Sequence, residues 1–120
     1  MDREPELPEI ALSVHRLLIR IGRRRDEPWE NVSPEWASFC VRAARGAIEL
    51  LQSMEGRKAS EIAAAVAKQV GGPLPPLEWE AVVRLVHTEV DCDDEDFRSL
   101  DQAEEFWAGW LNEKKAACAT

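Results

Sequence analysis

Apolar residues recur along this chain at intervals of three and four positions, the spacing of one face of an α-helix. The first such run covers residues 8–21 and ends at Gly22, a residue type that closes helices easily. The second run opens with Ser33 and Pro34, because serine caps a helix start and proline suits its first position. It continues to about Gly56. We expect both runs to form helices that pack one apolar face against a core.

Three more helices are expected in the second half: over about residues 60–70, from Pro76 to about Val90, and from about Ser99 or Asp101 onward. The valines of the fourth helix are β-branched and weaken its helical preference without breaking the repeat. No stretch has the paired alternating pattern of strands. The pattern predicts an all-α, single-domain compact bundle of about five helices over residues 1–120. We expect residues 1–7 to be flexible and residues 112–120 to be frayed.

Two tryptophans stand in the connection between the first two helices, within the stretch DEPWENVSPEW at residues 26–36. Trp36 falls in the first turn of the second helix, so we expect it to face the core. Trp29 precedes the cap residue by four positions and can fold back over both helices. We expect Trp29 to fasten this helical hairpin. The alternative is that it binds a partner, because tryptophan is frequent among the residues that dominate interfaces.

The formal net charge of −8 is concentrated in the second half of the chain. Residues 1–60 hold ten basic and ten acidic side chains, whereas residues 61–120 hold five basic and thirteen acidic ones. An acidic surface of this kind repels nucleic acid and attracts basic proteins. Such a charge also keeps a protein soluble, and that simpler interpretation stays open here.

The acidic side chains of the second half are the candidate partner-binding residues. They are Glu78, Glu80, Glu89, Asp91, Asp93, Asp94, Glu95, Asp96, Asp101, Glu104 and Glu105. We expect them to form one surface that occupies a basic surface on another protein, such as a surface that binds nucleic acid. This interpretation predicts a non-enzymatic protein-binding module.

Two other functions also fit the sequence. The apolar helix faces suit a structural or assembly protein that associates with itself. A small helical subunit of a nucleoprotein complex would contact nucleic acid through a basic cluster, Arg16, Arg20, Arg23, Arg24 and Arg25. Direct binding of nucleic acid is the less favoured function. The helix from Pro76, placed like the recognition helix of a helix-turn-helix unit, carries three glutamates against one arginine.

No motif predicts an enzyme, a cofactor or a metal ion. The two histidines, His15 and His87, are far apart, and no second Cys/His pair at ligand spacing accompanies them. The acidic run 91–96 lacks the glycine and the final glutamate of a calcium loop, since Asp96 and Gln102 stand at those positions. Neither a glycine-rich phosphate loop nor a nucleophile elbow occurs. We therefore expect a protein without catalytic activity.

The cysteine content and the N-terminal residues favour the cytoplasm. Cys40, Cys92 and Cys118 are an odd number without CxxC spacing, which fits free thiols in a reducing compartment. The N-terminal residues are charged and contain no apolar segment like that of a signal peptide. No apolar run reaches the roughly 20 residues that a membrane span needs. We expect a cytoplasmic protein without membrane contact.

Residues 10–51 resemble a pattern found in small all-α bacterial and phage proteins of uncharacterised function. The pattern is an amphipathic helix, a short linker, and W-x-x-[LV]-[ST]-P-E followed by an aromatic residue and A-R-x-A-[IL]. The matching residues are Trp29, Val32, Ser33, Pro34, Glu35, Phe39, Ala44, Arg45, Ala47 and Ile48. Phe39 stands where tyrosine is usual, and the arginine expected before the aromatic residue is replaced by Trp36 or Ala37. The resemblance implies a helical hairpin. By analogy with small acidic phage proteins, it also implies an inhibitor of the anti-CRISPR or another anti-defence type.

Overall fold

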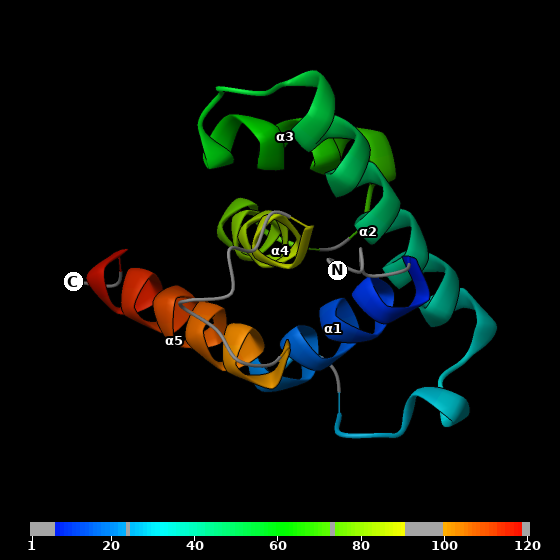
Figure 1. Ribbon diagram of the computed structural model, residues 1–120. Helices are drawn as coiled ribbons and strands as arrows, with labels where there is room; N and C mark the ends of the chain where they lie inside the picture. The colour runs from blue at the N-terminus through cyan, green and yellow to red at the C-terminus, as the bar shows by residue number, and fades with distance from the viewer. Residues whose placement is uncertain (1–6, 24, 73, 91–99, 119–120) are drawn as a thin grey trace, which may run out of the picture.

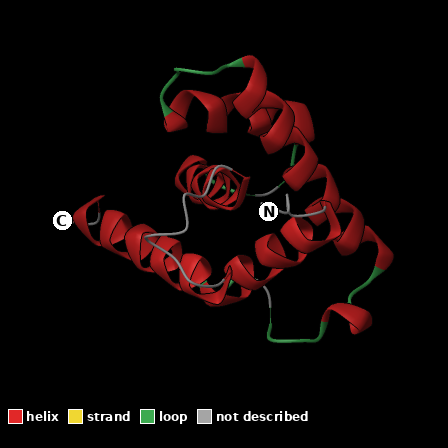
Figure 2. Cartoon of the chain, in the orientation of Figure 1, coloured by secondary structure: helices red, strands yellow, loops and turns green. Residues whose placement is uncertain are grey.

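Helices make up most of the chain that the computed structural model describes, namely residues 7–23, 25–72, 74–90 and 100–118. In chain order they are α1 (Leu7–Arg20), the short 3-10 helix η1 (Trp29–Asn31), α2 (Pro34–Ser53), α3 (Ala59–Val70), α4 (Pro76–Val90) and α5 (Leu100–Cys118), as Figure 1 shows. Within the described residues Figure 2 shows helices and their connections and no strand. The predicted fold class, an all-α compact single domain, is confirmed.

The start of α2 is held by the cap that the sequence predicts. The Ser33 hydroxyl accepts a hydrogen bond from the backbone N–H of Trp36 at 3.3 Å, and Pro34 occupies the first helical position. Such a cap typically stabilises a helix by about 1 kcal/mol. It also fixes the position of Trp36 in the first turn of the helix.

α4 is the central helix of the bundle. It contacts α1, α2, α3 and α5, and Figure 1 shows it nearly end-on among them. A helix with neighbours on several sides has no broad solvent face, so some of its polar positions are buried along with its apolar ones. The buried residues of α4 are Glu78, Trp79, Ala81, Val82, Val83, Leu85, Val86 and Glu89.

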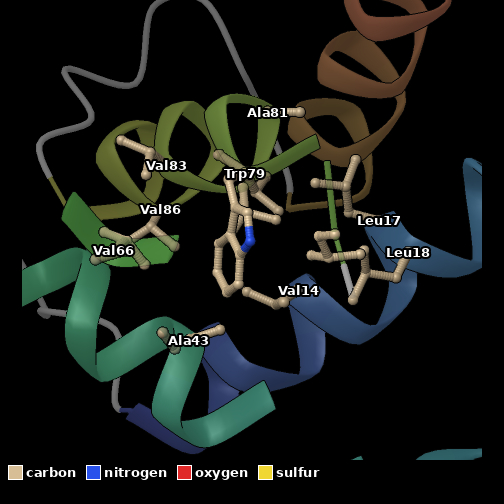
Figure 3. Close-up of a cluster of buried hydrophobic side chains, with 14 of the residues drawn as sticks. Val14, Leu17, Leu18, Ala43, Val66, Trp79, Ala81, Val83 and Val86 are labelled. Carbon is tan, nitrogen blue, oxygen red and sulfur yellow. The ribbon is translucent and has the colours of Figure 1, made fainter. Parts of the chain in front are cut away.

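The core is built around Trp79, which projects from α4 and is 1% exposed. Figure 3 shows its indole ring reaching toward Val14 of α1 and Ala43 of α2. Small side chains on α2 permit this close approach, since Ala43, Ala44 and Ala47 are fully buried. Removing one large apolar side chain from water contributes about 1.5–3 kcal/mol. Packing around Trp79 therefore holds α1, α2 and α4 together.

The last helix continues further than the sequence pattern indicates. α5 extends through residue 118, so residues 112–118 of the segment that we expected to be frayed belong to this helix. Lys115, near this end, lies 3.1 Å from a carboxylate oxygen of Glu78 and ties α5 to α4. Of the segment 1–7 that we expected to be flexible, only the last residue is described.

Candidate functional site

Three of the glutamates predicted to form an acidic surface lie inside the protein. The exposed fractions of Glu78, Glu89 and Glu104 are 0%, 6% and 0%. The prediction that these three side chains face a partner is therefore wrong. The physical reason is that α4 is surrounded by other helices and α5 covers part of it.

The burial of these glutamates follows from two stripes on facing helices. On α4 the stripe is Glu78, Val82, Leu85 and Glu89. On α5 it is Glu104, Ala108, Leu111 and Lys115. Residues spaced by four, three and four positions lie on one face of a helix. Each stripe is apolar in the middle and charged at its ends, so burial of the apolar middle brings the charged ends inward.

α4 and α5 are antiparallel, and this decides which charged ends meet. Partner residues in α5 have lower numbers as the numbers in α4 rise: Glu78 with Lys115, Arg84 with Trp110, and Thr88 with Trp107. Opposite charges therefore meet at the start of α4. At the other end the carboxylate of Glu104 disfavours the ionisation of Glu89.

Glu78 is neutralised by two cations from different parts of the chain. Arg23, which follows α1, donates from Nε and Nη2 to the two carboxylate oxygens at 2.6 and 2.7 Å, and Lys115 donates at 3.1 Å. Burial acts to raise the pKa of Glu78, but the hydrogen bonds and charges of Arg23 and Lys115 outweigh it. The pKa consequently lies below the ordinary value of 4.5. Glu78 is thus a buried carboxylate that joins α1, α4 and α5.

Glu89 has the opposite environment. Neither of its carboxyl oxygens has a hydrogen-bond partner among the described residues. Its pKa is raised to about 8, first by burial and then by the carboxylates of Glu104 and Glu9. The Ser13 hydroxyl of α1 lowers this pKa, although it lies outside full hydrogen-bond geometry. At neutral pH Glu89 is therefore a buried neutral acid, whereas Glu104 has Arg20 at 3.7 Å.

Two other predicted acidic residues, Glu80 and Glu105, are not buried in this way. Glu105 is exposed, and Glu80 is partly buried and accepts a hydrogen bond from Arg84 Nε at 3.0 Å. Asp101 belongs to α5, but its side chain is not described. The residues of the predicted surface that fall outside the described part of the chain are Asp91, Asp93, Asp94, Glu95 and Asp96.

Two members of the predicted basic cluster take part in internal ion pairs. Arg20 and Arg23 are held by buried glutamates of α5 and α4. Arg16 and Arg25 are exposed, and Arg24 lies outside the described residues. The fold therefore uses basic residues of the first half to balance buried acids of the second half.

A buried histidine holds the connection between α1 and α2. His15 is 1% exposed, and its Nδ1 accepts a hydrogen bond from Nε1–H of Trp36 at 2.8 Å. Because an indole N–H can only donate, Nδ1 carries no proton and the neutral ring is protonated on Nε2. Nε2 donates to the backbone carbonyl of Glu27 at 3.1 Å. Sequence reasoning assigned His15 no role, because its two hydrogen-bond partners, Trp36 and Glu27, are distant from it in the sequence.

Trp29 closes this arrangement from the outside. Its ring centre lies 5.4 Å from that of His15, and its side chain is partly buried against the core. Further rings lead inward from Trp36 to Phe39 and then Trp79, with centres 5.4 and 5.8 Å apart. The connection is thereby tied to the centre of the core, and both tryptophans fasten the hairpin.

Trp29→Ala is expected to destabilise the protein. The change removes the ring that covers His15, and the loss of a partly buried indole costs about 2 kcal/mol. Urea unfolding followed by circular dichroism measures this loss. Glu30→Ala, at an exposed neighbour, is the control and should change stability by less than about 0.5 kcal/mol. Unchanged stability of Trp29→Ala, together with lost partner binding, would contradict the fastening role.

Two clefts on the described surface differ in charge. The first has a volume of 510 Å³ and lies between α1 and the connection to α2. Its lining combines Trp29 and Ile19 with the acids Asp26, Glu27 and Glu30 and with Arg16. The second has a volume of 340 Å³ and lies where α2, α3, α4 and α5 meet. Its lining includes Leu51, Ile62, Val83, Arg57, Arg84 and Trp107.

Arg84 and two tryptophans form a stack beside the second cleft. The guanidinium carbon lies 5.5 Å from the ring centre of Trp107 and 4.9 Å from that of Trp110. Contacts of this kind contribute about 0.5–1 kcal/mol each at exposed sites. Sequence reasoning missed this cluster because it counted Arg84 only as a lone cation among acids. Glu80, Arg84 and Thr88 are spaced by four residues and therefore share one face of the helix. This spacing was the signal from which the cluster could have been found.

The described part of the chain has two clefts lined by aromatic and charged side chains, and such clefts can bind a ligand. It contains no group of three or more His, Cys, Asp and Glu side chains placed to hold a metal ion. None of its helices is both long enough and apolar enough to cross a membrane. Comparison with known protein families, curated proteins and solved structures finds no match to this chain.

Proposed function

We propose that this chain is a non-enzymatic protein-binding module whose acidic surface occupies a basic surface on its partner. The observation that carries the proposal is the position of two apolar side chains. Val90, the last residue of α4, is 41% exposed, and Phe106 of α5 is 52% exposed. Val90 directly precedes the acidic segment 91–96, and Phe106 follows the exposed Glu105.

Apolar and acidic groups at neighbouring positions suit a basic protein partner. Exposed apolar side chains among charged residues frequently mark interfaces, and a large aromatic side chain is a common anchor. The carboxylates would steer a basic partner into contact, and the anchor would slow its release. Eleven acidic residues are predicted for this surface, and three of them are buried. The other eight are the candidates for contact with the partner.

The partner class that fits is a protein with a basic surface, such as a nucleic-acid-binding host or defence protein. An inhibitor that covers such a surface is the form that the resemblance of residues 10–51 implies. Direct contact with nucleic acid has less support, because Arg20 and Arg23 of the basic cluster are held by Glu104 and Glu78.

Charge reversal combined with rising salt tests the proposal. The tagged chain is incubated with nuclease-treated bacterial lysate, and the captured proteins are identified by mass spectrometry. We expect basic proteins that are released as salt is raised, because salt screens exposed charges. The triple variant Asp93→Lys, Asp94→Lys and Asp96→Lys should lose this capture, and Phe106→Ser should weaken it.

A second triple variant is the matched control. Asp26→Lys, Glu30→Lys and Glu49→Lys makes the same change in net charge at exposed positions elsewhere. We expect this control to keep its partners. Equal loss in both triple variants would show that net charge alone matters, and capture that resists salt would overturn the electrostatic proposal. A dimer in light scattering that Phe106→Ser dissociates would instead support self-association.

A further inference from the structure

The second cleft has the composition of a small-molecule site. Four elements supply its apolar floor, with Leu51 from α2, Ile62 from α3, Val83 from α4 and Trp107 from α5. Ile62 and Val83 are almost fully buried, so the floor is fixed by the core beneath it. The volume of 340 Å³ is at the lower end of the range of about 300–1,000 Å³ that holds small ligands. The space therefore suits an apolar body about the size of a fused ring system.

The rim of this cleft is mainly basic. Arg57, Arg84 and His87 line it, and Glu55 is the acid among the lining residues that the structure describes. Arg57 lies 3.8 Å from Glu61, and both side chains are well exposed. An exposed pair at this distance binds weakly, so a ligand can draw Arg57 toward itself at little cost.

Arg84 is held in place with donors to spare. Its guanidinium stacks on Trp107 and Trp110, and its Nε donates to Glu80 at 3.0 Å. Its other guanidinium N–H groups have no acceptor among the described residues. A guanidinium binds a carboxylate through two parallel hydrogen bonds, and a fixed one loses little entropy when it does so.

We propose that this cleft binds a small carboxylic acid with a ring-sized apolar body. The carboxylate lies at Arg57 and Arg84, and the body rests on the apolar floor against Trp107. α3 starts at Ala59 on the cleft wall without a side-chain cap, so its backbone dipole adds to the attraction for an anion. Glu55 opposes a second negative charge, which selects a monoanion. Val90, Glu105 and Phe106 are not among the described residues that line the cleft, so the described part of the proposed partner surface lies outside this site.

Nuclear magnetic resonance of the ¹⁵N-labelled full chain tests the site with three probes of one shape. The probes are 2-naphthoate, the neutral 2-naphthylmethanol and the cationic 2-naphthylmethylammonium. The indole N–H of Trp107, which donates to Thr88 at the cleft, is the reporter and is assigned with Trp107→Phe. We expect 2-naphthoate to shift this signal and to bind about tenfold more tightly than the alcohol, as one charged hydrogen-bond contact allows. The ammonium should bind most weakly.

Two variants and one control locate the binding. Arg57→Gln should weaken 2-naphthoate binding severalfold and leave the alcohol unaffected. Ala59→Leu, which fills the cleft, should abolish binding of both. Arg45→Gln, at an exposed position on α2 outside the cleft, is the matched control and should bind as the unaltered chain does.

Three results would overturn the proposal. The first is equal affinity for the acid and the alcohol. The second is a shift at Trp29 in place of Trp107, which would put the probe in the first cleft. The third is no effect of Arg57→Gln. The Asp93, Asp94 and Asp96 triple variant should bind 2-naphthoate normally, so failure of the protein-binding proposal and failure of this one are told apart.

Discussion

Arg23→Ala is expected to destabilise the protein strongly, whereas Arg25→Ala, two residues further on, should leave stability nearly unchanged. The reason is Glu78, whose side chain is fully buried and would keep only Lys115 as an ionic partner among the described residues. Leaving the buried Glu78 carboxylate short of partners costs on the order of 3 kcal/mol. Arg25 is exposed, and such a surface change alters stability by at most about 0.5 kcal/mol.

Urea unfolding of the two variants over a range of pH measures this difference in stability and the direction in which it changes with pH. The folded-state pKa of Glu78 is lowered from the ordinary 4.5, so its ion pairs stabilise the fold above that value. That contribution is lost as the pH falls through the lowered pKa. The variants should therefore differ most at neutral pH and converge in acid. Equal stability at neutral pH would mean that Arg23 is free to serve the basic surface predicted from the sequence.

Glu89→Gln is expected to stabilise the protein at alkaline pH and to change it little in mild acid. In the folded state Glu89 keeps its proton up to a pKa of about 8, whereas the unfolded chain releases it near 4.5. Between these values stability falls as the pH rises, by up to about 1.4 kcal/mol per pH unit. Glutamine has the shape of the neutral acid and cannot ionise. The advantage of the variant should therefore grow to the order of 4 kcal/mol above the folded-state pKa.

Chemical denaturation at several pH values, with each variant compared with the unaltered chain, measures this effect. Glu105→Gln is the control, because Glu105 is exposed on α5 close to the same end of the helix pair. Its stability should follow that of the unaltered chain at every pH. If Glu89→Gln showed the same loss of stability with rising pH as the unaltered chain, Glu89 would not be a buried neutral acid.

The helices could be predicted from the sequence because their signals are local. Ser33 and Pro34 mark the start of α2 within two residues, and the apolar repeat of α1 lies within one segment. The central position of α4 could not be predicted in this way, because it depends on how the helices pack. The contact at the end of α5 could not be predicted for a similar reason, since the partner of Lys115 belongs to another helix.

The acidic surface was only partly predictable for a related physical reason. Glu78 and Glu89 stand three turns apart, in line with Val82 and Leu85, and this spacing is visible in the sequence. The same spacing also suits a solvent-facing row of acids, so it does not separate buried from exposed side chains. The deciding contact is with Arg23, which lies 55 residues before Glu78.

The contacts of Trp29, Trp36 and His15 show the same division between local and distant partners. Trp29 and Trp36 belong to one short connection, so their fastening role could be argued from position alone. Their common partner His15 lies on α1, 21 residues before Trp36, and nothing adjacent to it indicates the contact. The second cleft draws its lining from four helices, and no segment by itself contains its pattern.

The contacts between the first helix and the last also constrain the order of folding. α2, α3 and α4 follow one another along the chain and contact one another, so short loops allow them to pack early. α1 packs on its neighbour α2 but also has more distant partners, because Arg23 reaches Glu78 and Glu78 also pairs with Lys115, a further 37 residues on. During synthesis α1 is the first of these helices to emerge and among the last to complete its contacts. Until α5 is made, the glutamate at the start of α4 lacks one of its two cations, and the bundle stays open on that side.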